Sequence, residues 1–405
     1  MRVLFVAGDT IPHVGGKSSH VIDLAKGMRA LGVSTDIISL RSLGRLSELS
    51  IKARLAFYRL NDRNVFYYRF QSIWRDRLNQ LVREACELRG YEFISVQDAF
   101  AGSAIARAVD ETGITAVLTM HTYFGLENGL DRRDQGSQQI YEAQLSRELE
   151  ALSVVQGVIA VDDRIRCHVE KATRRVDQSA LKVKRITSIP NFTDVSLYSP
   201  PTLSERIEAR HALGLSNEQF AVCCVRRLVE KNGVLKAVEA MLELGGTSIV
   251  LLIAGDGPQK PEIVEFVREK GLSDRVRLLG ALDRERVLQL YRASDVSVVP
   301  SITVNGLQEA TSISAIEAMA CGLPTVASNI GGLSQLIESG ETGVLCEEGE
   351  SRDIADAFVR LRLDEDFRRR IGSAGRRQVE LHHSHLAAAR EYLNEFVNCS
   401  QGGQT

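Results

Sequence analysis

Short apolar runs alternate with amphipathic segments over most of this 405-residue chain. Each run has the length of a buried strand, and the first series occupies residues 2–7, 34–40, 93–97, 115–120, 157–161 and 185–189. Segments with apolar residues at helical spacing lie between them, over 18–31, 102–110 and 138–152. Buried strands joined by crossover helices form parallel sheets covered on both faces, so the pattern predicts an α/β fold.

The alternation starts again after a proline-rich segment, 190–201, which has the composition of an interdomain linker. The second series predicts strands at 219–225, 248–254, 275–279, 296–299 and 324–327, with helices at 234–244, 259–270, 284–293 and 313–321. The tail, 352–398, reads as helical without a further strand. Because a chain of this length exceeds one core of roughly 150–200 residues, we predict two domains, 1–195 and 205–379.

Composition excludes several classes of protein. The chain is 44% hydrophobic and 25% charged with a formal net charge of −2, which gives no reason to expect a nucleic-acid partner. Its seven cysteines show neither metal-ligand spacing nor a disulfide framework, so we expect a reducing, cytoplasmic setting. The first apolar run is too short for a signal peptide, and no run is long enough to span a membrane.

Two glutamates, Glu309 and Glu317, stand eight positions apart where a loop becomes a predicted helix. Backbone N–H groups and the helix dipole attract phosphate at such a place. The two carboxylates can lie up to ~12 Å apart along a helix axis. The spacing therefore indicates two contacts on one elongated anionic ligand. The alternative is structural, because Ser314 and Glu317 also fit a capping box.

Polar residues follow several other predicted strands. Gly15-Gly16-Lys17-Ser18 resembles the end of a phosphate-binding P-loop but lacks its first glycine, since Ile11 stands there. An ATPase, a glycine loop that lines a cleft and a plain turn all remain open. His121 and Asp98 come directly after strands, where open α/β sheets place their chemistry.

The second half carries cations at a comparable place. Arg226, Arg227 and Lys231 follow its first strand, where they can neutralise a diphosphate or form a solvated basic loop. Gly255 lies in the turn Gly255-Asp-Gly-Pro258, whose glycines allow close approach of a base or ribose. The D-x-D pattern occurs only as Asp364-Glu365-Asp366, so no metal site is expected.

Residues 41–83 hold ten Lys and Arg against three acids, with aromatic residues interleaved. This segment can lie on an anionic membrane surface or grip a polyanionic acceptor, and it can also be a helical insertion whose aromatics are core.

Taken in order, these motifs resemble the retaining enzymes of glycosyltransferase family 4, which have the GT-B fold. The resemblance covers nearly the whole chain: Gly15-Gly16, His121, Ile189-Pro-Asn191, Arg227 with Lys231, Gly255-Asp-Gly-Pro258, Ala293-Ser-Asp295, Pro300-Ser301 and Glu309-x7-Glu317. It implies two Rossmann-like domains that face an interdomain cleft, with a C-terminal helix (380–405) packing back on the first.

The resemblance also implies roles for single residues. Glu317 is expected to bind the ribose and Glu309 the donor sugar near its anomeric centre. Arg227 and Lys231 would stabilise the departing diphosphate with help from the Gly15-Gly16 amides, and His121 would hold the sugar or acceptor side. No metal or other cofactor is implied.

Two departures from the family pattern concern the donor. Glu309-Ala-Thr-Ser312 replaces the usual Glu-Gly-Phe-Gly, so the hydroxyls of Thr311 and Ser312 are expected to affect donor choice. The usual arginine-to-lysine step is five residues, which fits Arg226 to Lys231, whereas Arg227 to Lys231 is four. The sequence thus leaves open which arginine contacts the diphosphate.

We therefore expect a cytoplasmic, metal-independent retaining glycosyltransferase. It would transfer a hexosyl or N-acetylhexosaminyl unit from a nucleotide-sugar to a glycan, lipid-linked or small-molecule hydroxyl, with peripheral contact at the inner membrane face. The alternatives are an epimerase, a phosphorylase-like enzyme and a non-catalytic nucleotide-sugar-binding protein.

Overall fold

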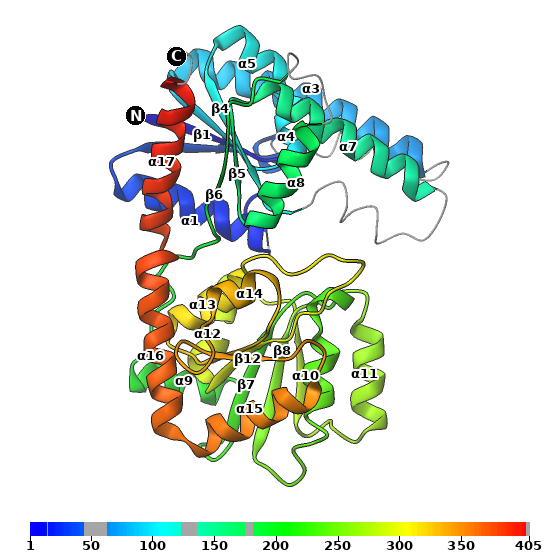
Figure 1. Cartoon of the computed structure of the whole chain (residues 1–405), viewed down its shortest axis with the longest axis vertical. Coiled ribbons are helices and arrows are strands. Elements are labelled where there is room, and N and C mark those ends of the chain that lie inside the picture. The colour runs from blue at the N-terminus through cyan, green and yellow to red at the C-terminus, as the bar shows by residue number, and fades with distance from the viewer. Residues whose placement is uncertain (14, 44–62, 123–135, 175–180, 402–405) are drawn as a thin grey trace. The chain divides into compact units, whose positions relative to one another are not determined.

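The computed structural model describes residues 1–13, 15–43, 63–122, 136–174 and 181–401. It contains two compact units, which we call unit 1 (residues 1–190 and 388–405) and unit 2 (residues 191–387). Figure 1 shows a twisted sheet with helices on both sides in each of them.

Unit 1 contains a six-stranded parallel sheet in the order β2-β1-β3-β4-β5-β6. The strands are β1 (Arg2–Val6), β2 (Ser34–Ile38), β3 (Phe93–Val96), β4 (Thr115–Met120), β5 (Gly157–Ala160) and β6 (Arg185–Ser188). Its helices are α1 (Gly16–Ala30), η1 (Leu40–Leu43), α3 (Arg63–Arg89), α4 (Ala99–Ala104), α5 (Ala106–Thr112), α7 (Gly136–Val154), α8 (Asp163–Thr173) and most of α17 (His385–Gln401).

Unit 2 contains a second parallel sheet in the order β12-β11-β10-β7-β8-β9. The strands are β7 (Phe220–Val225), β8 (Ile249–Ala254), β9 (Val276–Gly280), β10 (Val296–Val299), β11 (Thr325–Ser328) and β12 (Val344–Cys346). The helices are α9 (Leu203–Ala212), η3 (Glu230–Asn232), α10 (Val234–Ala240), α11 (Lys260–Glu269), α12 (Arg284–Ala293), α13 (Ile313–Ala320), α14 (Gly331–Leu336), α15 (Ser351–Leu363) and α16 (Glu365–His382).

The strand order reverses once in each sheet, between β1 and β3 in unit 1 and between β7 and β10 in unit 2. Open parallel α/β sheets bind ligands outside the carboxyl ends of the strands at such a switch point. The loops that follow β1, β3, β7 and β10 are therefore the first places to look for a site.

The predicted α/β class and the predicted strands are confirmed, with boundaries within about two residues. The expected helix at 102–110 is instead two short helices, because the chain turns at Ile105 between α4 and α5. The sequence interpretation missed β12, which has only three residues, and the helices α8, α9 and α14.

The segment expected to be a linker, 190–201, packs into unit 2 from Asn191 onward. Phe192 and Tyr198 are buried in that unit, and Thr193 pairs with Ser384 in an isolated parallel bridge. The aromatic side chains hold this proline-rich stretch in place.

The basic and aromatic segment 41–83 lies partly outside the described residues. Its second half forms α3, and Trp74 on that helix is core: it is 1% exposed and donates a 3.4 Å hydrogen bond from Nε1 to the Gly8 carbonyl. Membrane or acceptor contact by the segment stays a prediction. Within the described part of the chain, every helix is too short or too polar to cross a bilayer.

Candidate functional site

The loops after β7 and β10 lie at the switch point of the unit 2 sheet and carry most of the expected donor-site residues. Residues 226–233 connect β7 to α10, and residues 300–312 connect β10 to α13. The loops are joined by a hydrogen bond from the Ile302 amide to the Lys231 carbonyl at 2.9 Å. Gly233 permits this contact, since a Cβ there would lie 1.8 Å from the Pro300 carbonyl oxygen.

A bidentate ion pair between Arg226 and Glu309 lies at the centre of these loops. Arg226 donates from Nη2 to Glu309 Oε2 at 2.8 Å and from Nη1 to Oε1 at 3.2 Å. The side chains are only 7% and 15% exposed. Paired N–H···O bonds of this kind fix the orientation of a carboxylate, so the position of Glu309 is set by Arg226.

The Nη groups of Arg226 also lie within hydrogen-bond distance, 2.6 to 2.9 Å, of three further side-chain oxygens, which share the two remaining Nη hydrogens: Asn232 Oδ1, Ser301 Oγ and Ser312 Oγ. Burial lowers the pKa of this guanidinium, but the charge and hydrogen bonds of Glu309 outweigh that effect and leave the pKa above its ordinary value. Arg226 is thus a charged group that connects the two loops. Its buried Nε has no hydrogen-bond partner within the part of the chain that the structure describes.

Arg227 has a different environment from its neighbour. Its side chain is exposed, and among the described residues its guanidinium has neither a hydrogen-bond nor an ion-pair partner. Lys231 is partly buried on the same loop. With Arg226 committed to Glu309, Arg227 is the arginine that can meet a ligand without breaking an existing contact.

Gly255 directly follows the neighbouring strand β8 and packs against the loop that carries Arg226. Its φ is +154°, and a Cβ would lie 1.8 Å from the Arg226 carbonyl oxygen. Gly257 is equally confined, because its Cβ would lie 2.3 Å from the Leu228 carbonyl oxygen. The Gly255-Asp-Gly-Pro258 turn therefore packs against the backbone of the Arg226 loop, and close packing is sufficient to explain its glycines.

Thr311 and Ser312 are buried at the start of α13 rather than exposed. The Asn191 side chain donates to the Thr311 carbonyl at 2.7 Å, and the Gly332 amide donates to the Glu309 carbonyl at 3.0 Å. Ser312 is the N-cap of α13, but its hydroxyl makes no capping bond; it accepts from Arg226 instead. This leaves the first turn of α13 without a side-chain cap, which suits binding of an anion.

The capping-box interpretation of Ser314 and Glu317 is wrong. The helix starts after Ser312, so Ser314 is already inside it and cannot be the N-cap. Glu317 is 5% exposed, and its Oε2 accepts a hydrogen bond from the Tyr291 hydroxyl at 3.2 Å. Burial and then the charge of Glu317 raise the pKa of Tyr291 well above its ordinary value. Glu317 thus has a structural partner in the core, and its contact with a ribose stays a prediction.

Unit 1 has its own polar cluster at the switch point between β1 and β3. Lys17 forms ion pairs with Asp9 and Asp98, the latter at 2.9 Å, and Asp98 also caps α4 through Ala101. Burial lowers the pKa of Lys17, but the two carboxylates outweigh it and raise the pKa overall. A P-loop lysine must reach a phosphate, whereas Lys17 is held by two acids. The structure therefore disfavours the ATPase alternative, and Gly15-Gly16 start α1.

His121 follows β4 in the same unit, as the sequence indicated. Its Nε2 lies 3.3 Å from Gln97 Oε1, and its ring stands perpendicular to that of His20 with centroids 4.5 Å apart. Burial, followed by the charges of His20 and Lys17, lowers the pKa of His121 well below its ordinary value. The imidazole is therefore neutral at physiological pH.

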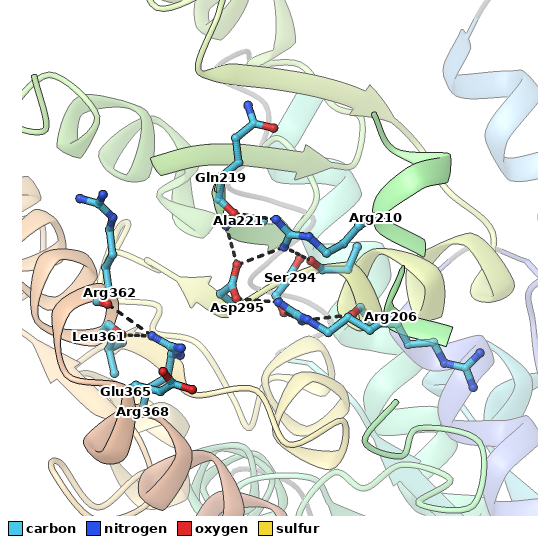
Figure 2. A network of polar contacts seen from close by, with 12 residues as sticks. Arg206, Arg210, Gln219, Ala221, Ser294, Asp295, Leu361, Arg362, Glu365 and Arg368 are labelled. Atoms are coloured by element: carbon cyan, nitrogen blue, oxygen red, sulfur yellow. Dashed lines mark hydrogen bonds and ion pairs between the residues drawn. The ribbon is translucent and has the colours of Figure 1, made fainter. Parts of the chain in front are cut away.

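The Ala293-Ser-Asp295 motif lies at the opposite, amino edge of the unit 2 sheet, just before β10. Asp295 accepts from Arg206 Nη2 at 2.6 Å, from Arg210 Nη1 at 3.3 Å and from the Ala221 amide at 2.8 Å (Figure 2). Figure 2 shows both guanidinium groups directed at this carboxylate. These bonds tie α9 to β7 and β10, so the motif is structural.

Several residues of both clusters were not recognised from sequence: Asn232, Tyr291 and Gly332 in unit 2, and His20 and Gln97 in unit 1. Gly332 acts through its contact with the Glu309 carbonyl in another loop. Asn232 acts through hydrogen bonds to Arg226 and Arg227 within its own irregular loop, which has no recognisable sequence pattern. His20 had a detectable signal, since it is a histidine one turn inside the helix that begins at the Gly15-Gly16 loop. Within the described residues, no three His, Cys, Asp or Glu side chains form a metal-binding group.

Comparison with known proteins gives matches in both units. The family model described as Glycosyl transferases group 1 matches residues 205–378, and the model described as Glycosyltransferase Family 4 matches residues 14–197. A D-inositol 3-phosphate glycosyltransferase of Nocardia farcinica is 31% identical over 307 residues, which are 72% of this chain and 63% of that protein.

An N-acetyl-alpha-D-glucosaminyl L-malate synthase of Bacillus anthracis is 29% identical over 197 residues, 48% of this chain and 49% of that protein. The chain thus spans less than two thirds of the length of either relative. Among solved structures, sucrose-phosphate synthase from Thermosynechococcus elongatus superposes with a TM-score of 0.74 and 22% identity over 100% of both chains. This likeness in fold confirms the predicted GT-B class.

Proposed function

The chain belongs to the group 1 glycosyltransferases, enzymes of the transferase class, and we propose that it is a retaining transferase that uses a nucleotide-sugar donor. The transferred group would be a hexosyl or N-acetylhexosaminyl unit, and the acceptor a hydroxyl.

One observation supports this proposal most directly: Arg227 is exposed beside a loop whose carboxylate, Glu309, is held in a fixed orientation by Arg226. A nucleotide-sugar has a diphosphate and a sugar within one molecule, so it needs a cation and an oriented hydrogen-bond acceptor close together. Arg227 with Lys231 would bind the diphosphate, and Glu309 would accept from a sugar hydroxyl near the anomeric carbon.

The proposed reaction begins with cleavage of the bond between the anomeric carbon and the β-phosphate oxygen. Its electron pair goes to the diphosphate, where Arg227, Lys231 and the uncapped first turn of α13 would stabilise the developing negative charge. The acceptor oxygen then bonds to the anomeric carbon on the same face, and its proton passes to the departing phosphate oxygen. These cations would stabilise the negative charge on the leaving diphosphate, a role that a metal ion can also fill.

Unit 1 would supply groups for the acceptor. His121 is neutral, so its imidazole can accept a hydrogen bond from a hydroxyl group. The names of the two relatives contain D-inositol 3-phosphate and L-malate, which are both small hydroxylated anions. We therefore favour a small hydroxylated anion over a polysaccharide as the acceptor.

The test is a product assay with UDP-, GDP- and ADP-linked hexoses and N-acetylhexosamines, offered with inositol 3-phosphate, malate and glycan acceptors. We expect nucleoside diphosphate release that requires one acceptor, an α-linked product from an α-linked donor by NMR, and no loss of rate with EDTA. Release without a glycosylated product would favour the epimerase alternative. No release with any pair would contradict the proposed function.

A further inference from the structure

A buried polar chain connects the C-terminal helix α17 to His121 inside unit 1. The Tyr392 hydroxyl on α17 lies 3.1 Å from His20 Nε2, and the His20 ring stands perpendicular to the His121 ring at 4.5 Å. Tyr392 and His20 are both 0% exposed.

Gln97 determines which nitrogen of His121 carries the proton. In the assigned orientation of its amide, Gln97 donates from its nitrogen to Ser95 Oγ at 2.8 Å and turns Oε1 toward His121. An amide oxygen only accepts, so in this arrangement His121 donates from Nε2. The neutral ring then has its lone pair on Nδ1, which becomes the hydrogen-bond acceptor.

His20 restrains the same ring through a second contact. The hydrogen bond between His20 Nε2 and the Tyr392 hydroxyl limits rotation of the His20 ring. The Tyr392 hydroxyl also accepts a hydrogen bond from Thr119 Oγ1 at 3.5 Å. Burial raises the pKa of Tyr392 above its ordinary value, so the phenol keeps its proton. On the same helix, Phe396 stacks on Phe93 of β3 with centroids 5.5 Å apart, which anchors α17 on the sheet.

We propose that Tyr392 and His20 are positioning residues that hold His121 in the Nε2–H tautomer, with Nδ1 presented as acceptor for a ligand hydroxyl. Tyr392 fixes the His20 ring, and His20 with Gln97 fixes the His121 ring. The C-terminal helix is thereby part of the acceptor machinery of unit 1. This inference rests on the proposed function for its catalytic meaning, but not for the tautomer itself.

The first experiment is independent of activity. Nitrogen-15 NMR of histidine-labelled full-length protein reports the tautomer and the pKa of His121 directly. We expect one Nε2–H tautomer in the wild type, and a mixture of tautomers with a shifted pKa in Tyr392→Phe and His20→Gln. Tyr91→Phe is the matched control: it removes another tyrosine hydroxyl of unit 1, one bonded to Asp36 at 2.8 Å, and should leave the His121 signals unchanged.

The second experiment is kinetic. Tyr392→Phe should lower kcat roughly fivefold, the effect of one lost buried hydrogen bond, with little change in the KM for the donor. In a His121→Ala background the same change should have no further effect, because the residue acts through His121. Unchanged His121 signals in both variants, or an equal loss of kcat in the His121→Ala background, would overturn the proposal. If the His121 tautomer changes in the two variants as expected but the wild type shows no transferase activity, only the proposed function is refuted.

Discussion

Arg226 holds Glu309 through two parallel hydrogen bonds across 83 residues of sequence, and both side chains are largely buried. Removing one member of a buried pair leaves the other charge uncompensated, which costs about 3–5 kcal/mol. We predict that Arg226→Ala lowers the free energy of unfolding by about that amount, measured in urea.

The double variant Arg226→Met with Glu309→Leu should lose much less than the sum of the two single changes, since no unpaired charge remains. Arg268→Ala is the control, because Arg268 is 72% exposed on α11. Removing this side chain should change the free energy of unfolding by no more than about 0.5 kcal/mol. Strict additivity of the two single changes would show that the pair is not coupled.

Arg227 should behave in the opposite way from its neighbour. It is exposed, so Arg227→Ala should change the free energy of unfolding by no more than about 0.5 kcal/mol. If it stabilises the departing diphosphate, its loss should lower kcat by roughly a hundredfold or more. Steady-state kinetics and urea unfolding on the same preparation separate these effects. A stable variant with wild-type kcat would remove Arg227 from the mechanism.

Gly255 is predicted to be intolerant of any side chain. Its positive φ and the 1.8 Å approach to the Arg226 carbonyl oxygen require the backbone to move in Gly255→Ala, at a cost of about 2 kcal/mol or more. Gly245→Ala is the matched control, because a Cβ there meets nothing within 4 Å. Thermal unfolding of the two variants side by side tests the difference, and equal melting temperatures would refute close packing as the reason for Gly255.

The lowered pKa of His121 predicts that the free energy of unfolding depends on pH. The pKa is lowered in the folded protein, so the unfolded chain binds the proton more readily. The contribution of neutral His121 is fully present above the unfolded pKa of about 6.5, and it is lost as the pH falls from there toward the folded pKa. Urea unfolding between pH 5.5 and 7.5 should show a steeper decline for the wild type than for His121→Asn. Identical slopes would contradict a lowered pKa of His121 in the folded protein.

The sequence predicted those features that depend on local pattern. Strands such as Val296–Val299 appear in the sequence as short apolar runs. His121 could be located because it directly follows another such run, Thr115–Met120. The short strand Val344–Cys346 has too few residues to give a pattern of its own. Roles that depend on distant contacts could not be predicted, so the sequence could not distinguish Arg226 from Arg227. The start of α13 at Ile313 was predicted, but its capping was misread for the same reason, because the hydroxyl of the N-cap Ser312 accepts from Arg226.

The central claim is that unit 2 binds a nucleotide-sugar at the edge formed by the loops after β7 and β10. Isothermal titration calorimetry of the wild type and of Arg227→Ala, with UDP-, GDP- and ADP-sugars, tests it most directly. We predict saturable binding of the sugars of one nucleotide to the wild type, and at least a tenfold higher Kd in Arg227→Ala, a loss of about 1.4 kcal/mol. Binding of none of these donors to the wild type, or equal affinity in the two proteins, would contradict the account.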